Sequence, residues 1–305
     1  MATLLDFRRR IRSVRNTQQI TRAMKFVAAA RLRRAQEKAF AARPYARLMQ
    51  RVLRSAMARV ENPAHPLMAR RAEERVLLLV LSGDRGLCGA FNANVIRKAM
   101  EFLRAHRQQT LALIPIGKKG RDALRKQKWS FAAEYINVTT RVEFGQAKTI
   151  AAQVIERYAG AEADAVYMVY NEFKSVLTQR LTVEKLLPIE PESLASPADE
   201  TPATEAMPGR LPAAETEAFP VDYIYEQPAA EILGRLLPRH VETQVFRAML
   251  ESSAAEHAAR MTAMDSATNN AAELIDHLTL HMNKVRQAAI TKEILEVVSG
   301  AAWTA

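Results

Sequence analysis

Near the end of the chain, apolar side chains recur at alternating steps of three and four residues. Between Arg239 and Ser299 there is neither glycine nor proline. This heptad seam predicts a long helix that supercoils with a partner rather than a globular helix. At about 1.5 Å per residue, such a helix is roughly 90 Å long. The seam consists of Leu250, Ala254, His257, Met261, Met264, Thr268, Ala271, Ile275, Leu278, Met282, Val285 and Ala289.

The beginning of the chain carries a matching seam. Residues 1–43 also lack glycine and proline. We expect Pro44 to interrupt this helix, a helical pattern to resume to about Val60, and Asn62-Pro63 to end it. Two long helices from opposite termini predict an antiparallel coiled coil. The seam consists of Leu4, Phe7, Ile11, Val14, Gln18, Thr21, Lys25, Ala28, Leu32, Ala35, Ala39 and Ala42.

The N-terminal seam turns polar at Gln18, Thr21 and Lys25. An adjacent apolar stripe consists of Ile20, Met24 and Val27. The pattern predicts that the apolar stripe shifts around the helix at this point. Two interpretations remain open: the helices repack locally, or this turn faces a second partner.

Short apolar runs alternate with helical patterns between residues 75 and 189, which predicts a small parallel or mixed α/β sheet. The strands are expected at 75–82, 110–117, 131–138, 164–170 and 178–187, the last of them at an edge. The helices are expected at 92–106, 118–128 and 143–159. Residues 190–222 differ, because Pro, Ala, Glu and Thr dominate without any hydrophobic period, and they predict an acidic loop.

The predicted fold class is therefore α plus α/β. A long antiparallel coiled coil of residues 1–62 and 239–305 is joined to a central Rossmann-like α/β domain of residues 75–189. The acidic loop 190–222 and a connecting segment 223–238 lie between that domain and the C-terminal helix.

Composition limits the environment of the chain. Cys88 is its one cysteine, which excludes an internal disulfide and fits a reducing compartment. No apolar run reaches the ~18–20 residues that span a bilayer. The Arg-rich start resembles a transit peptide, but it belongs to the seam and contains Asp6, so we reject that interpretation. We expect a soluble or peripheral protein.

Charge is distributed unevenly along the chain. The net charge is +11, with +14 in residues 1–75 and −7 in residues 190–222. The N-terminal helix is thus a positive rod. Its excess charge favours an acidic partner or nucleic acid.

Local motifs give little sign of catalysis. Gly83–Gly89 follows a strand and precedes a helix, as phosphate loops do, but it has neither a Gly-Lys-Ser/Thr ending nor the G-x-G-x-x-G pattern, so a structural turn is favoured. His277 and His281 have the spacing of a metal pair, with Glu273 as a third ligand, but no metalloprotease Glu lies between them. Cys88 has no local His and is expected to be a buried structural thiol. We expect no active site, cofactor or metal.

Four segments resemble the gamma subunit of F-type ATP synthase. They are MKFVAAARLRRAQ (24–36), SGDRGLCGAFN (82–92), YNEFK (170–174) and ITKEILEVVSGA (290–301). The resemblance extends in order over essentially the whole chain, with the same two rods and middle domain. The start at Met1 follows the bacterial pattern, without a leader.

The resemblance implies a central rotor shaft, present as one copy in its complex. The coiled coil would sit inside a ring of three alpha and three beta subunits, and the foot would lie against the c ring and the epsilon subunit. Proton flow would turn the shaft, while ATP chemistry belongs to the beta subunits. The implied location is the cytoplasmic side of the bacterial plasma membrane, as a peripheral protein.

The resemblance also implies contact residues, position by position. Those matching contacts with the alpha/beta ring are Met24, Lys25, Arg260, Gln287, Thr291 and Glu293. Those matching the c-ring contact of the foot are Tyr223, Tyr225 and Glu226. The stretch 190–222 is longer than in simple bacterial forms and lacks the cysteine pair of the chloroplast regulatory insert, which argues against thiol control.

The sequence also leaves two other classes of protein to consider. An Arg-rich coiled-coil protein that binds nucleic acid is supported by the positive N-terminal section, but that section lacks interleaved aromatic residues. A nucleotide-dependent α/β enzyme needs a phosphate loop that the sequence lacks.

Overall fold

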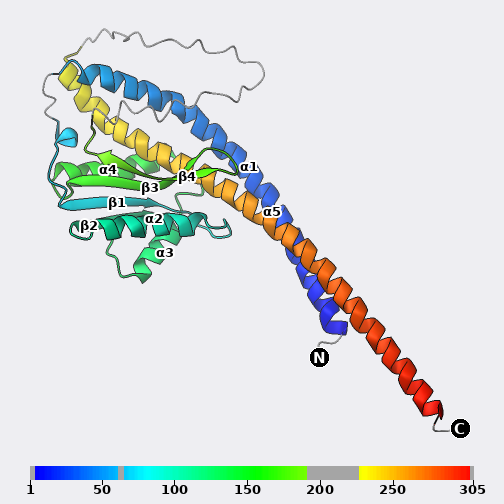
Figure 1. Cartoon of the computed structure of the whole chain (residues 1–305). Coiled ribbons are helices and arrows are strands. Elements are labelled where there is room, and N and C mark those ends of the chain that lie inside the picture. Colours follow the sequence, from blue (N-terminus) through cyan, green and yellow to red (C-terminus); the bar gives the residue numbers. More distant parts are fainter. Residues whose placement is uncertain (1–3, 61–64, 191–226, 303–305) are drawn as a thin grey trace, which may run out of the picture. The chain divides into compact units, whose positions relative to one another are not determined.

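The chain consists of two long terminal helices and, between them, a sheet with shorter helices (Figure 1). The computed structural model describes residues 4–60, 65–190 and 227–302. The terminal helices are α1 (Leu4–Met57) and α5 (Ala229–Ala302). The elements between them are the 3-10 helix η1 (Pro66–Met68), β1 (Arg75–Leu81), α2 (Phe91–Ala105), β2 (Thr110–Ile116), α3 (Lys118–Lys126), α4 (Phe144–Ala159), β3 (Ala165–Phe173) and β4 (Gln179–Leu187).

The chain divides into two units, to which α1 and α5 both contribute. We call residues 1–32, 87–89 and 257–305 the coil unit, and residues 33–86 and 90–256 the sheet unit. The coil unit holds the first part of α1 and the last part of α5. The sheet unit holds the rest of both helices together with all four strands.

The prediction that Pro44 interrupts the first helix is wrong, because α1 is continuous through it. Proline removes one backbone donor from a helix, but Pro44 is exposed and does not disturb the buried side. After Ala42 the seam continues in phase with the buried residues Ala46, Met49, Leu53 and Ala56. Packing along this seam stabilises the helix across the proline.

The second long helix begins earlier than the predicted Arg239. It starts at Ala229 and contains Pro238. Leu233, Leu237 and Val241 of this part are buried in the core of the sheet unit. The window without glycine and proline therefore predicts too short a helix, because α5 extends before Arg239 through Pro238.

The sheet has the strand order β2-β1-β3-β4. β1 pairs in parallel with β2 and β3, and β4 pairs antiparallel with β3 at the edge, as predicted. The expected strand at 131–138 is wrong: Phe131 and Tyr135 form only isolated bridges to β2. The Pro115 carbonyl oxygen of β2 accepts a hydrogen bond from the Tyr135 amide. Proline has no N–H to donate to the neighbouring segment, so a regular ladder cannot form there.

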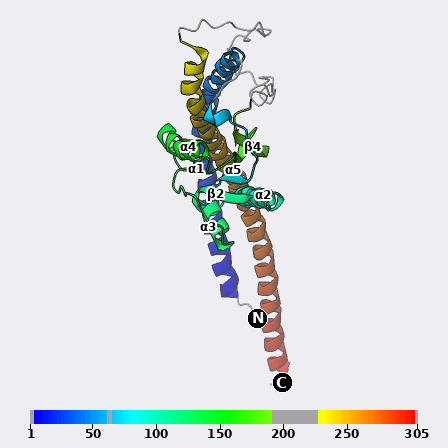
Figure 2. The ribbon, with the colours of Figure 1, turned by 90° about the vertical axis from the view of Figure 1, so that its left-hand side faces the viewer.

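Both faces of the sheet are covered within the sheet unit. Leu77, Leu79 and Leu81 belong to a core shared with α4 and with the sheet-unit parts of α1 and α5. Leu78 and Val80 belong to a second core with α2 and α3. Figure 2 shows α4 and α2 on opposite sides of the strands. β1 is therefore buried on both faces, which explains its continuous apolar run.

Candidate functional site

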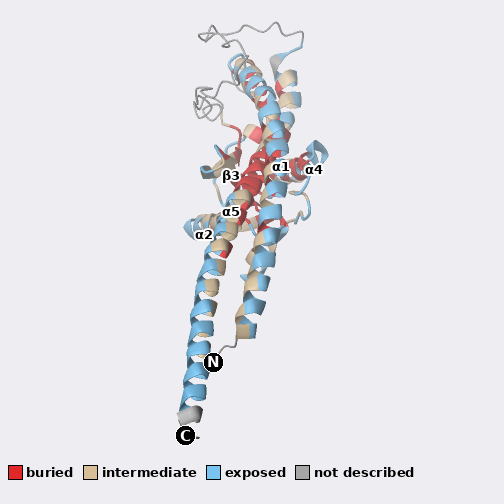
Figure 3. Ribbon diagram, turned by 90° about the vertical axis from the view of Figure 1, so that its right-hand side faces the viewer, coloured by how far each residue is buried: buried red, intermediate tan, exposed pale blue. Residues whose placement is uncertain are grey.

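The candidate site is the surface of the coil unit, where α1 and α5 lie side by side and run in opposite directions (Figure 1). The predicted seam is confirmed on both helices. Every described seam residue of α1 from Leu4 to Ala28, and of α5 from His257 to Ala289, is buried or half-buried. Figure 3 shows this as a line of intermediate burial along the facing sides of the helices, with exposed residues outside it.

Two cross-helix contacts define the register of the coiled coil. The Thr21 and Thr268 hydroxyl oxygens lie 2.8 Å apart, and either can be the donor. The Phe7 ring lies beside the His281 ring, with centroids 5.1 Å apart. Phe7 lies two heptads before Thr21, and His281 lies nearly two heptads after Thr268. The two contacts therefore belong to one register of the coiled coil.

The polar residues of the N-terminal seam stay inside the interface, so the predicted shift of the apolar stripe is wrong. Lys25 pairs with Asp265 across the helices, next to the threonine contact. The seam polarity on α1 is thus matched by polarity on α5. Ile20 and Val27 of the predicted stripe are 60% and 52% exposed, whereas Met24 is half-buried, so the stripe does not replace the seam against α5. That this turn faces a second partner stays a prediction.

The sequence did not predict that Thr268 pairs with Thr21 and Asp265 with Lys25, although Thr268 belongs to the predicted seam. The available signal was the seam itself, because Thr268 is one of only two non-apolar residues in the C-terminal seam. Aligning it with the polar turn of α1 gives the observed register.

Arg260 lies on the buried side of its helix rather than on the outer surface. It is 8% exposed, and its guanidinium lies 3.2 Å from the His257 Nδ1 atom. Burial, together with the positive charges of Arg260 and Arg31, lowers the pKa of His257 to about 4. His257 is therefore neutral at pH 7 and can accept a hydrogen bond from Arg260.

The remaining predicted residues of this surface lie at the far end of α5. Gln287, Thr291 and Glu293 are exposed, and the Thr291 hydroxyl donates to the Gln287 carbonyl oxygen one turn earlier on the same helix. All described side chains from Ile290 to Ser299 are exposed. Five of them are large and apolar: Ile290, Ile294, Leu295, Val297 and Val298.

Positive charge covers the outer side of α1 in the coil unit. The exposed cations are Arg8, Arg9, Arg10, Arg12, Arg15 and Arg22. Exposed charges of this kind attract an acidic surface at long range but contribute only ~0–1 kcal/mol per pair.

The other motifs have structural environments. Asp84, in the turn that begins at Gly83, is 8% exposed, and its carboxylate accepts hydrogen bonds from the amides of Lys118, Asn137 and Thr139 and from the Thr139 hydroxyl. This confirms a structural turn. Cys88 is buried, as expected.

The histidine pair on α5 does not form a metal site with other residues in the described part of the chain. His277 and His281 are exposed, and so is Glu273. No group of three or more His, Cys, Asp or Glu residues suited to a metal ion occurs among the residues that the structure describes.

Some predicted residues lie outside the described ranges. Tyr223, Tyr225 and Glu226, together with nearly all of the acidic stretch 190–222, fall within residues 191–226. For the described helices, none is both long and apolar enough to cross a membrane.

Known proteins match nearly the full length of the chain. A family model described as ATP synthase matches residues 3–302. The chain is 51% identical to the ATP synthase gamma chain of Solibacter usitatus, over 99% of both chains. It is 47% identical to the ATP synthase gamma chain of Desulforudis audaxviator, again over 99% of both.

Solved structures share the fold. A chain in the cryo-EM structure of the Euglena gracilis mitochondrial ATP synthase OSCP/F1/c-ring aligns with a TM-score of 0.64 at 21% identity, covering 98% of this chain and 93% of that one. A chain in the Tetrahymena thermophila mitochondrial central stalk and c-ring structure aligns with a TM-score of 0.59 at 24% identity, covering 81% and 99%.

Proposed function

The chain belongs to the ATP synthase gamma chain family, and from that premise we propose that it is the central rotor shaft of an F-type ATP synthase. In this role it couples proton flow through a membrane c ring to ATP synthesis at the beta subunits, by turning inside the alpha/beta ring. Its partners are the alpha, beta and epsilon subunits and the c ring, with one copy of this chain in each complex.

The observation that carries the proposal is the exposed end of α5. Large apolar side chains from Ile290 to Val298 stand in solvent on a helix that no other described part of the coil unit covers. A contiguous apolar surface of this kind marks an interaction site. We assign this surface to contact with the alpha/beta ring.

The contact residues are proposed on the same basis. Gln287, Thr291 and Glu293 are exposed beside the apolar end and are available to the ring. Met24 and Lys25 lie at the polar turn of α1, where Lys25 is already paired with Asp265, so we assign its ring contact to long-range attraction rather than to a bond. Arg260 acts from inside the coil unit through His257.

Foot contacts are assigned to Tyr223, Tyr225 and Glu226, as part of the surface that meets the c ring. Aromatic side chains with polar tips resist shear at an interface, as a fixed attachment requires. Through this attachment the chain is a peripheral protein on the cytoplasmic side of a bacterial plasma membrane.

The chain has no catalytic site of its own in this proposal, and ATP chemistry belongs to the beta subunits. The turn Gly83–Gly89, which most resembles a phosphate loop, supports this, because its Asp84 carboxylate is occupied by structural contacts with the amides of Lys118, Asn137 and Thr139. The alternative of an Arg-rich nucleic-acid-binding protein finds no support in the comparisons.

The test is isolation of the complex through a tag on this chain. Alpha, beta and epsilon subunits and the c ring should co-purify, and ATP should drive proton pumping by the complex in vesicles. Salt-sensitive retention on DNA without these subunits would contradict the proposal.

A further inference from the structure

A run of α5 in the sheet unit is buried on all sides although it carries polar residues. Every side chain from Ala248 to Glu256 is buried. A helix buried all round is normally apolar all round. Glu251 is an exception, with 5% exposure, and a buried carboxylate is costly unless it is paired and hydrogen-bonded.

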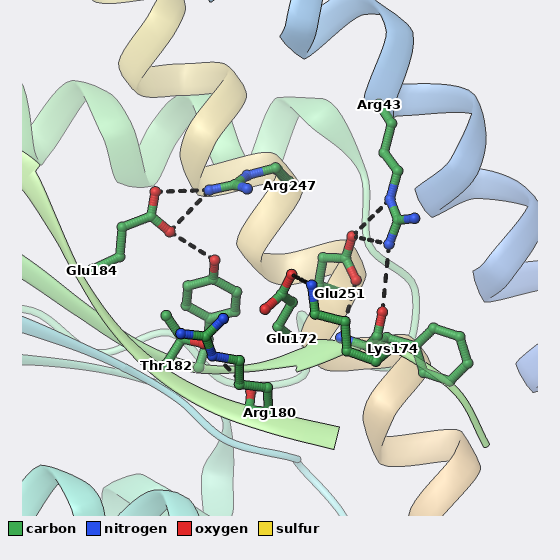
Figure 4. A network of polar contacts seen from close by, with 10 residues as sticks. Arg43, Glu172, Lys174, Arg180, Thr182, Glu184, Arg247 and Glu251 are labelled. Atoms are coloured by element: carbon green, nitrogen blue, oxygen red, sulfur yellow. Dashed lines mark hydrogen bonds and ion pairs between the residues drawn. The ribbon is translucent and has the colours of Figure 1, made fainter. Parts of the chain in front are cut away.

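The Glu251 carboxylate joins three elements (Figure 4). Its Oε1 atom accepts from Arg43 of α1, at 2.9 Å from Nη2 and 3.2 Å from Nε. Its Oε2 atom accepts from the backbone amide of Phe173, the last residue of β3, at 3.1 Å. Arg43 also donates to the Phe173 carbonyl oxygen at 3.4 Å. One buried carboxylate thus binds α5 to α1 and to the end of the sheet.

One turn earlier, α5 makes a second polar attachment to the sheet (Figure 4). Arg247 donates to both Glu184 oxygens of β4, at 2.7 and 2.9 Å. The Tyr170 hydroxyl of β3 donates to the same carboxylate at 2.7 Å. Burial raises the pKa of Tyr170 well above its ordinary value, so this phenol remains a donor.

These contacts add direction to the surrounding apolar packing. The hydrophobic effect is non-directional, so apolar burial by itself specifies the rotation of a helix about its axis less sharply than paired polar groups do. Ion pairs and hydrogen bonds have directions, and their best-attested structural role is to specify register and orientation. The two attachments lie four residues apart on one side of α5, which resists both rotation and sliding.

We propose that Glu251 is a positioning residue for torque: with Arg43 and the Phe173 backbone, it fixes α5 and α1 to the sheet, so that force applied to the α/β domain turns the helix pair. The inference rests on the proposed rotor function. It gives the small α/β domain a mechanical role, as the part through which rotation reaches the helices.

The test uses Glu251→Gln in the complete complex, reconstituted in vesicles. The amide has nearly the shape of the carboxylate but loses the charge that holds Arg43. ATP hydrolysis should persist, while the number of protons pumped per ATP falls. The Phe173 amide should exchange its hydrogen about tenfold faster or more, the factor that a lost hydrogen bond to a charged group implies. The control is Glu37→Gln, the same change in an exposed α1 pair with Arg33.

Each outcome decides the matter. Faster exchange at Phe173 with normal pumping per ATP would show that Glu251 is only structural and would overturn the inference. If Glu251→Gln prevents assembly, Arg43→Lys replaces it, because this variant keeps the charge and loses the two-nitrogen contact; the same fall in pumping per ATP is expected, and normal pumping again overturns the inference. Absence of pumping by the unaltered complex would instead refute the rotor function.

Discussion

Exchanging the charges of Lys25 and Asp265 should restore what each single reversal damages. Lys25→Glu places two carboxylates at the seam, and Asp265→Lys places two ammonium groups there. The double variant has opposite charges again, in reversed order. Because Lys25 and Asp265 pair within the coil unit, the double variant should recover the stability that each single variant loses. If Lys25 paired with another subunit instead, the change at Asp265 would restore nothing.

The size of the effect follows from the exposure of the two side chains. They are 38% and 47% exposed, so their attraction contributes only ~0–1 kcal/mol. A like-charge pair at about 4 Å adds a repulsion of about 1 kcal/mol in water. Each single variant should therefore lower the free energy of unfolding by about 1–2 kcal/mol, and the double variant should return to within about 0.5 kcal/mol of the original.

Thermal unfolding of the full chain measures the effect, at about 2–4 °C per kcal/mol for a protein of this size. Amide exchange in residues 18–28 locates it on α1. The matched control exchanges Lys292 and Glu296, an exposed pair on one helix whose side chains are 78% and 65% exposed, where all three variants should stay close to the original. A double variant at Lys25 and Asp265 that is as unstable as the two singles combined would refute the internal pairing.

Three further changes have defined outcomes. Gly117→Ala should lower the free energy of unfolding by about 3 kcal/mol or more, as measured by chemical denaturation. The φ of Gly117 is +104°, which suits glycine, and an added Cβ would lie 2.1 Å from the Ser82 carbonyl oxygen just after β1. The control is Gly145→Ala, which should be neutral or stabilising because nothing lies within 4 Å of the added Cβ. Since the pKa of His257 is lowered to about 4 from 6.5, the unfolded chain binds the proton more readily, so stability should fall as pH drops from 6.5 to 4, and His257→Gln should flatten that part of the curve. Tyr225→Ala with Glu226→Ala should leave ATP hydrolysis intact and reduce ATP-driven proton pumping, and normal pumping at unchanged hydrolysis would contradict the foot assignment.

Periodicity alone identified both long helices and their facing sides, because a heptad seam repeats a local physical requirement at every turn. It also located four strands, whose apolar runs are buried on one or both faces. Pro44 predicts a break only when its local cost is taken without the seam, and α1 is continuous through it. The buried residues Ala46 and Met49 continue the phase of Ala42, and packing along that seam outweighs one missing donor.

Contacts between distant residues were harder to predict than elements. Lys25 and Asp265 are separated by 240 positions, so their pairing depends on the relative register of two helices, which no local window contains. The same holds for Arg43 and Glu251. A strand was wrongly expected at 131–138 because its residues have strand character, whereas the neighbouring Pro115 lacks the donor that a ladder needs.

Each unit contains an ion pair between α1 and α5, and the two pairs differ in how much stability their loss would cost. In the coil unit, Lys25 and Asp265 are half-exposed and replaceable at a cost of about 1–2 kcal/mol. In the sheet unit, Glu251 is buried, and removing its partner would leave an uncompensated charge at a cost of about 3–5 kcal/mol. A shaft that turns within a ring needs weak, exposed contacts along its sliding surface and strong, directional ones where it is attached. The exposed arginines along the outer side of α1 fit the first need, and the buried Glu251–Arg43 pair fits the second, in the sheet unit where we propose that torque reaches the helix pair.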